Sequence, residues 1–299
     1  MAKASLSHAT TPLSNRVFGQ HLQTLDLPML SHILPVGPLL AFCLAILVGS
    51  FTNGLAGLAF AGVSGGIVFW VLPATSAVAV LAVCGFLLQF CNNIHYFKNV
   101  DWRKIAIYAI PGFAGIPLGS YLLTFLPKVI VSLIFGLVLL VYVLLTARKK
   151  RATENDFGGR PGEIILGFIG GVLSGMLALP GIPVIIWSNI RGYGKEKQRG
   201  LSVPFNFLML LATVAITGIK GSYGDSLSQV QLLIAVPVAL IGWSIGVRCF
   251  GRISETGFRR FVMLVLLFSS FTLIVPSAAS LFSENQQHAS VEPTAKNIG

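Results

Sequence analysis

Eight long apolar runs, separated by short polar segments, constrain the fold of this chain more than any other feature. Several of them approach the roughly 20 residues that a helix needs to cross a bilayer. Only 10% of the 299 residues are charged, whereas soluble domains carry about a quarter, and no period-2 alternation of a membrane β-barrel is present. The sequence therefore predicts an all-α polytopic membrane protein. The runs lie at about 34–50, 51–92, 105–126, 128–147, 163–190, 201–219, 230–250 and 259–281.

The run 163–190 is interrupted at its centre by Pro180, Gly181 and Pro183. A proline in a helix interior costs about 3 kcal/mol, because it removes a donor and clashes with the preceding turn. Irregular backbone at membrane depth is tolerated only where protein or a water-filled cavity surrounds it. We therefore expect a re-entrant segment, which turns round at these prolines and leaves on the side from which it entered. The alternative is a kinked ordinary span, which gives eight plain transmembrane helices.

The distribution of basic residues favours the re-entrant topology. With eight plain spans, the 21 Lys and Arg residues divide almost evenly between the two sides. With a re-entrant segment, all of them except Lys128, Lys220 and Lys296 fall on one side, which the positive-inside rule makes cytoplasmic. Topology thus accounts for the net charge of +11, and no basic soluble domain that would bind nucleic acid is present.

The two halves of the chain resemble each other. "GSFTNG" at 49–54 resembles "GGVLSG" at 170–175, and each is followed by an interrupted apolar run that ends in tryptophan, at Trp70 and Trp187. We expect a duplicated helical repeat in which the halves are inverted and each carries one broken segment. In the first half, the turn is expected within "AGVSGGIVFW" at 61–70.

The N-terminal segment lacks the basic-then-apolar layout of a signal peptide, so the span 34–50 is expected to be an uncleaved anchor that precedes the first hairpin. The four cysteines form no C-x-x-C pair and are expected to be packing residues, with no metal or cofactor. The expected organisation is a cytoplasmic tail 1–33, a first membrane repeat 34–147, a basic cytoplasmic linker 148–162, a second membrane repeat 163–281 and a disordered tail 282–299.

Three segments carry a family resemblance. "LSGMLALPGIPVIIW" at 173–187 resembles the glycine-rich signature of the sulfite exporter TauE/SafE family, also called the 4-toluene sulfonate uptake permeases. "PATSAVAVL" at 73–81 and "SVPFNFL" at 202–208 are similar to two further family segments, and the likeness covers about residues 35–281. Pro180 and Ile182 stand where the family has glycine. The resemblance implies transport of small sulfur-containing or organic anions, such as sulfite or sulfonates.

None of the ten acidic residues lies within an apolar run, although Glu163 lies at the edge of one, and no Lys or Arg is central. We therefore expect an anion to be held by partial charges, at the free N–H groups of half-helix N-termini. Glycine permits an anion to approach the backbone closely, although glycines in membrane spans also serve helix packing. Ser, Thr and Asn side chains within spans can likewise form structural hydrogen bonds within or between helices. The candidate residues are Gly65, Gly66 and Gly181 for the backbone, and Ser64, Ser174, Asn206, Asn53, Thr75 and Ser76 for side chains.

These observations favour a secondary transporter or facilitator for a small anion in a cytoplasmic membrane, with the lipid bilayer as its environment. A non-transporting membrane scaffold is the alternative, although it would not need two broken segments. The "GVSG" at 62–65 matches a rhomboid-type protease motif, but no histidine stands within a later span to act as base, so we expect no enzyme. The sequence leaves open whether the protein forms a homo-oligomer.

Overall fold

The computed structural model describes residues 36–56, 60–93, 101–147, 158–224, 226–249 and 255–291. Within these ranges all regular structure is helical, and seven helices are long and apolar enough to cross a membrane, which confirms the all-α polytopic class. Two further apolar helices, α4 and α9, are shorter. The elements are α3 (Val36–Ala56), α4 (Phe60–Val71), α5 (Ala74–Asn93), α6 (Trp102–Phe125), α7 (Lys128–Ala147), α8 (Gly159–Leu177), α9 (Gly181–Ile190), α10 (Lys195–Ile219), α11 (Ser226–Cys249) and α12 (Glu255–Val291).

The prolines of the second half end one helix and begin another, as the sequence predicts. Helix α8 ends because Ala178 adopts the left-handed conformation at φ 55°. The N–H of Ala178 then donates to the carbonyl of Ser174 at 2.9 Å, the 5→1 bond of an αL motif. Pro180 caps the start of α9. Pro183 falls in the first turn of α9, where a helix needs no backbone donor.

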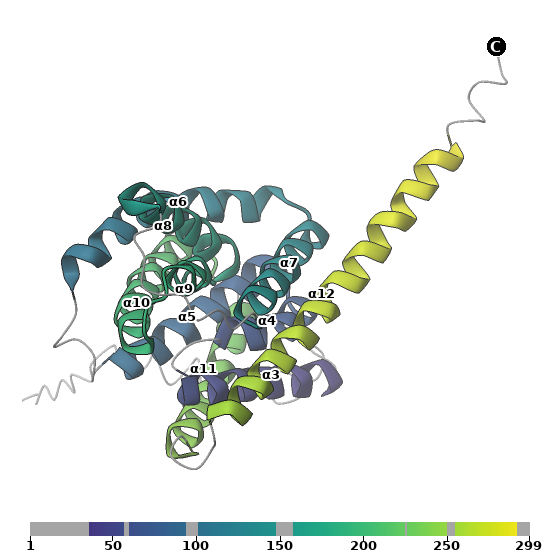
Figure 1. Cartoon of the computed structure of the whole chain (residues 1–299). Coiled ribbons are helices and arrows are strands. Elements are labelled where there is room, and N and C mark those ends of the chain that lie inside the picture. Colours follow the sequence, from purple (N-terminus) through teal and green to yellow (C-terminus); the bar gives the residue numbers. More distant parts are fainter. Residues whose placement is uncertain are drawn as a thin grey trace, which may run out of the picture. The chain divides into compact units, whose positions relative to one another are not determined.

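Helix α6 lies beside α8 (Figure 1), and the order of their contacts shows that the two run in the same direction. The glycines of α8 bring the two backbones close: Gly167 lies against Tyr108, and Gly175 two turns later lies against Ile116. Residue numbers therefore rise together along the contact. The two helices pack through small residues, as membrane helices commonly do.

Helix α10 also runs parallel to α6. The rings of Tyr108 and Phe205 lie 6.3 Å apart, and further along Lys220 Nζ donates to the carbonyl of Ser120 at 2.9 Å. Because α8 and α10 both run parallel to α6, α9 must return the chain between them. The second half therefore contains the re-entrant hairpin that the sequence predicts, formed by α8 and α9.

The first half contains a matching hairpin formed by α3 and α4. The hydroxyl of Ser64 donates to the carbonyl of Ala45 at 3.0 Å, and Phe60 packs against Gly49, so α4 folds back along α3. Helix α3 runs parallel to α11, with the carbonyl of Leu47 facing Gly242 and that of Phe51 facing Gly246. This contact repeats the pairing of α8 with α6.

The two halves are inverted relative to each other. Helices α5 and α10 follow the two hairpins and are therefore counterparts. They lie antiparallel, since Gly85 packs against Leu210 whereas Phe86 and Phe90, further along α5, lie against Phe207, earlier in α10. Counterpart helices of opposite direction define an inverted duplication, and the structure confirms this prediction.

Two expectations about the first half are corrected. Residues 61–70 do not break; they form continuous helix, and the interruption lies between Ala56 and Phe60. The run 34–50 is not a separate span before the hairpin, because α3 is itself the first arm of that hairpin. The tail 1–33, placed on the cytoplasmic side by the charge count, lies outside the described residues, as does linker segment 148–157. Helix α12 continues to Val291, into the segment for which disorder is expected.

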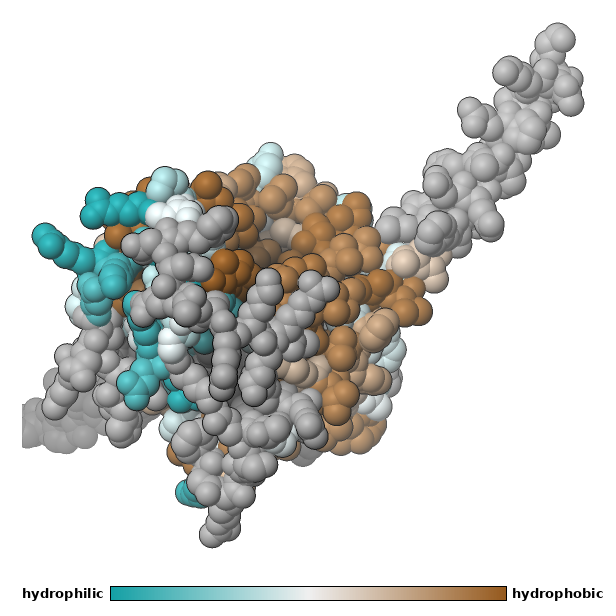
Figure 2. Space-filling view, in the orientation of Figure 1, coloured by the Kyte–Doolittle hydropathy of each residue, from teal (hydrophilic) through white to brown (hydrophobic). Residues whose placement is uncertain are grey.

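Large apolar side chains cover much of the described surface. Ile110, Phe125, Leu264 and Phe268 are each more than 60% exposed, and apolar residues dominate the coloured part of the face in Figure 2. Exposed apolar surface on this scale is typical of helices that face lipid.

Candidate functional site

The tips of the two hairpins line one cavity of about 70 Å³. Asn53 at the end of α3 and Phe60–Gly62 at the start of α4 come from one hairpin, and Ala178–Ile182 come from the other. A cavity needs about 10–15 Å³ of such space to hold one water molecule, so this cavity has room for more than one water or for one small anion. The remaining walls are Gly85, Gln89, Leu139, Tyr142, Ile185, Asn206, Leu210 and Leu266.

The cavity lies at the N-termini of two short helices. The first turn of α4 (Phe60–Gly62) and that of α9 (Gly181 and Ile182) both form its wall. First-turn N–H groups have no carbonyl partner inside their own helix, and each helix start carries about half a positive charge. Helix α9 has 10 residues and α4 has 12, so they extend about 15 and 18 Å, roughly half of a 30 Å hydrocarbon core. Their N-termini therefore lie near the membrane midplane.

Two amide side chains in the cavity wall have oxygen atoms without a hydrogen-bond partner in the described part of the chain. Gln89 is 3% exposed and Asn206 is 7% exposed, and neither Gln89 Oε1 nor Asn206 Oδ1 is satisfied. A buried polar group without a partner costs about 1–3 kcal/mol, so such groups indicate a place that a ligand or water occupies. A half-turn of the amide exchanges O and N, so each can offer a donor.

Asn53 provides the third amide of the wall. Its Oδ1 accepts a hydrogen bond of 2.7 Å from Asn92 Nδ2, which leaves the N–H₂ group of Asn53 for a ligand. None of the residues that line the cavity is Asp, Glu, Lys, Arg or His. The arrangement therefore offers partial positive charges and amide groups without a formal charge, which suits a desolvated small anion.

The structure brings three of the nine candidate residues to the cavity: Asn53, Gly181 and Asn206. Gly181 lies directly against Asn206, because a Cβ at position 181 would be 2.5 Å from Asn206 Oδ1. The first turn of α9 and this amide thus form one continuous part of the wall.

The other glycine candidates lie inside α4 at packing contacts. A Cβ at Gly65 would overlap the ring of Phe135, and one at Gly66 would overlap the hydroxyl of Ser269. Ser64, as noted, is bonded to α3. These three residues hold α4 against its neighbours and do not line the cavity.

The remaining side-chain candidates also lie elsewhere. Ser174 is fully buried and shares a hydrogen bond of 2.8 Å with Thr213, which links α8 to α10. At the start of α5, Thr75 is exposed and Ser76 is half-buried, and neither contributes to the cavity wall.

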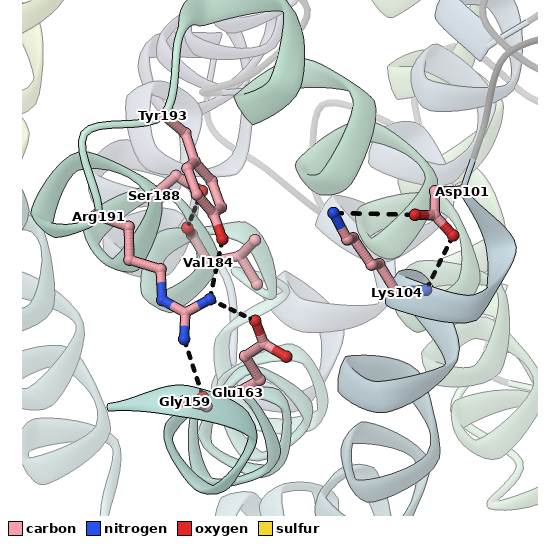
Figure 3. Close-up of polar contacts among 8 residues, drawn as sticks. All are labelled: Asp101, Lys104, Gly159, Glu163, Val184, Ser188, Arg191 and Tyr193. Carbon is pink, nitrogen blue, oxygen red and sulfur yellow. Dashed lines mark hydrogen bonds and ion pairs between the residues drawn. The ribbon is translucent and has the colours of Figure 1, made fainter. Parts of the chain in front are cut away.

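Sequence reasoning missed two features. Gln89 is an amide within the apolar run 51–92, and that isolation was an available signal, since a buried amide needs partners. The second is a buried ion pair at the base of the α8–α9 hairpin (Figure 3): Arg191 Nη1 lies 2.6 Å from Glu163 Oε1. Arg191 also donates to Tyr193 and to the carbonyl of Gly159, each at 2.9 Å.

Two inverted re-entrant hairpins whose helix N-termini meet at one cavity are typical of a membrane transporter. Comparison with known proteins gives the family. The chain belongs to the sulfite exporter TauE/SafE family, whose profile matches residues 41–273. A curated relative, the probable sulfite/organosulfonate exporter TauE of Cupriavidus necator, is 25% identical over 217 residues, which cover 70% of this chain and 82% of that protein. No solved structure matches.

Proposed function

We propose that the protein transports a small sulfur-containing anion, sulfite or a short organosulfonate, across a cytoplasmic membrane. The observation that carries the proposal is the convergence of two helix N-termini and three buried amides on one cavity, which no charged residue of the described ranges lines. The matched relative, named as a probable sulfite/organosulfonate exporter, supports the same substrate class. In this proposal, Gly181 and Ile182 supply backbone donors, and Asn53, Gln89 and Asn206 supply amide donors.

The size of the cavity favours the smallest members of this class. Sulfite and methanesulfonate have only four or five heavy atoms and suit a cavity of about 70 Å³. An aromatic sulfonate needs about twice that room. We therefore expect sulfite and methanesulfonate to be carried and toluenesulfonate to compete poorly.

The experiment that tests the proposal is flux into proteoliposomes that contain the purified protein. Saturable uptake of sulfite or methanesulfonate, absent from protein-free liposomes, is the expected result. Acetate, which has a planar carboxylate of similar size, serves as the comparison anion. Absence of saturable flux for every anion, with correctly folded protein, would remove the proposal.

A further inference from the structure

Three side chains from three helices form a hydrogen-bond chain behind the cavity. Trp243 on α11 places its indole Nε1 at 2.9 Å from Asn92 Oδ1, near the end of α5. Asn92 Nδ2 lies 2.7 Å from Asn53 Oδ1 on α3. Of the three, Asn53 lines the cavity and is 2% exposed, whereas Asn92 and Trp243 stand behind it.

The tryptophan sets the direction of this chain. An indole N–H donates and cannot accept, so the atom of Asn92 that faces it must be the oxygen. The N–H₂ group of Asn92 is then turned toward Asn53, and the atom of Asn53 that receives it must again be the oxygen. Exchange of O and N usually leaves the orientation of an amide open, but a donor-only group at one end removes that freedom.

We propose that Asn92 and Trp243 are positioning residues that hold the Asn53 amide with its N–H₂ group toward the cavity, which makes this wall a fixed donor for an anion. The inference rests on the proposed function and adds to it a determinant of specificity. An Asn53 turned the other way would present its oxygen, which repels an oxyanion and attracts a cation.

Asn53 differs in this respect from the other two amides of the wall. The oxygens of Gln89 and Asn206 have no partner in the described part of the chain, so those amides can turn to suit the ligand. Asn53 alone is tied to a donor-only group through a relay. Pre-orientation lowers the cost of ordering a side chain when the ligand binds.

The test reverses the relay with Asn92→Asp. A carboxylate only accepts, so it takes hydrogen bonds from the indole and from the N–H₂ group of Asn53, whose oxygen then faces the cavity. We expect the Kd for methanesulfonate, measured by calorimetry on the full chain in detergent, to rise at least tenfold. Asn92→Leu and Trp243→Phe release Asn53 without reversing it and should raise the Kd only a few-fold. A rise in Kd for Asn92→Leu as large as the rise for Asn92→Asp would overturn the inference.

The added charge of Asn92→Asp is controlled by repeating each variant in an Asn53→Ala background. A charge at position 92 acts on the anion in both backgrounds, whereas orientation acts only where Asn53 is present. We expect the rise in Kd caused by Asn92→Asp to be at least fivefold smaller in the Asn53→Ala background. Equal losses in both backgrounds would overturn the positioning role alone. Absence of binding to the wild-type protein would instead overturn the proposed function and this inference with it.

If Asn92→Asp does not fold, Trp243→Phe decides the question by the same comparison. Ser270→Ala is the matched control for a lost interhelical hydrogen bond, since its hydroxyl donates to the carbonyl of Gly136, away from the cavity. It should lower thermal stability and leave the Kd unchanged. A Trp243→Phe variant that behaves in the same way in both backgrounds would show that the relay is purely structural and refute the inference.

Discussion

A methyl group at position 181 tests whether the α9 N-terminus and Asn206 act as one site. The Cβ of Gly181→Ala would lie 2.5 Å from Asn206 Oδ1 and 2.7 Å from Nδ2, so the amide has to move away. The ligand then loses the hydrogen bond of Asn206, about 1–3 kcal/mol, which corresponds to a rise of about 5- to 150-fold in Kd. Gly181→Val also blocks approach to the backbone N–H groups and should exceed the effect of Asn206→Ala.

The assay is calorimetric titration of methanesulfonate into each purified variant, together with a thermal melt. In an Asn206→Ala background the clash is absent, so Gly181→Ala should raise the Kd much less there than in the wild-type background. Gly200→Ala is the matched control, because nothing lies within 4 Å of a Cβ at that position. An equal rise in Kd in the two backgrounds would refute the reasoning. An unchanged Kd with only a lower melting temperature would also refute it and would make Gly181 a packing residue.

Three further predictions concern stability and topology. Glu163→Gln removes the counter-ion of the buried Arg191 guanidinium and should lower the free energy of unfolding by about 3–5 kcal/mol. Asp101→Asn, at an exposed ion pair, should change that free energy little. Equal melting temperatures for the two variants would contradict this prediction. Ala178→Gly relieves a left-handed backbone and should raise stability by about 1 kcal/mol; a lower melting temperature would contradict this. In a cysteine-free background, cysteines at Arg160 and Gly194 should be labelled from the same, cytoplasmic side; opposite-side labelling would contradict the re-entrant hairpin.

The second hairpin could be predicted from sequence, whereas the first could only be predicted in outline. Pro180 and Pro183 mark the second break because proline cannot continue a helix. The first break lies between Ala56 and Phe60, where the chain has no proline, and the glycines at 62–66 drew the prediction to the wrong place. Glycine alone does not distinguish a helix end from a helix contact, and contacts are formed by residues from distant parts of the chain.

The residues of the candidate site could likewise be predicted from the sequence only in part. Gly181 stands within the break that the sequence reveals, and Asn206 is an amide within an apolar run, so each could be selected from the sequence alone. Gln89 reaches the cavity only because α5 lies antiparallel to α10, which no local pattern encodes. Glu163 and Arg191 are 28 residues apart and become partners only when the hairpin closes, so no local pattern in the sequence indicates the ion pair.

The central claim is that an anion is held by helix N-termini and amides in the cavity between the two hairpin tips. The most direct measurement is an experimental structure with selenite, an analogue of sulfite whose selenium atom can be located by anomalous scattering. The account predicts one selenium site within the cavity, with oxygens at hydrogen-bond distance from the backbone of Gly181 and from the amides of Asn53 and Asn206. A selenium site beside Arg191 at the hairpin base, with the cavity empty, would contradict it.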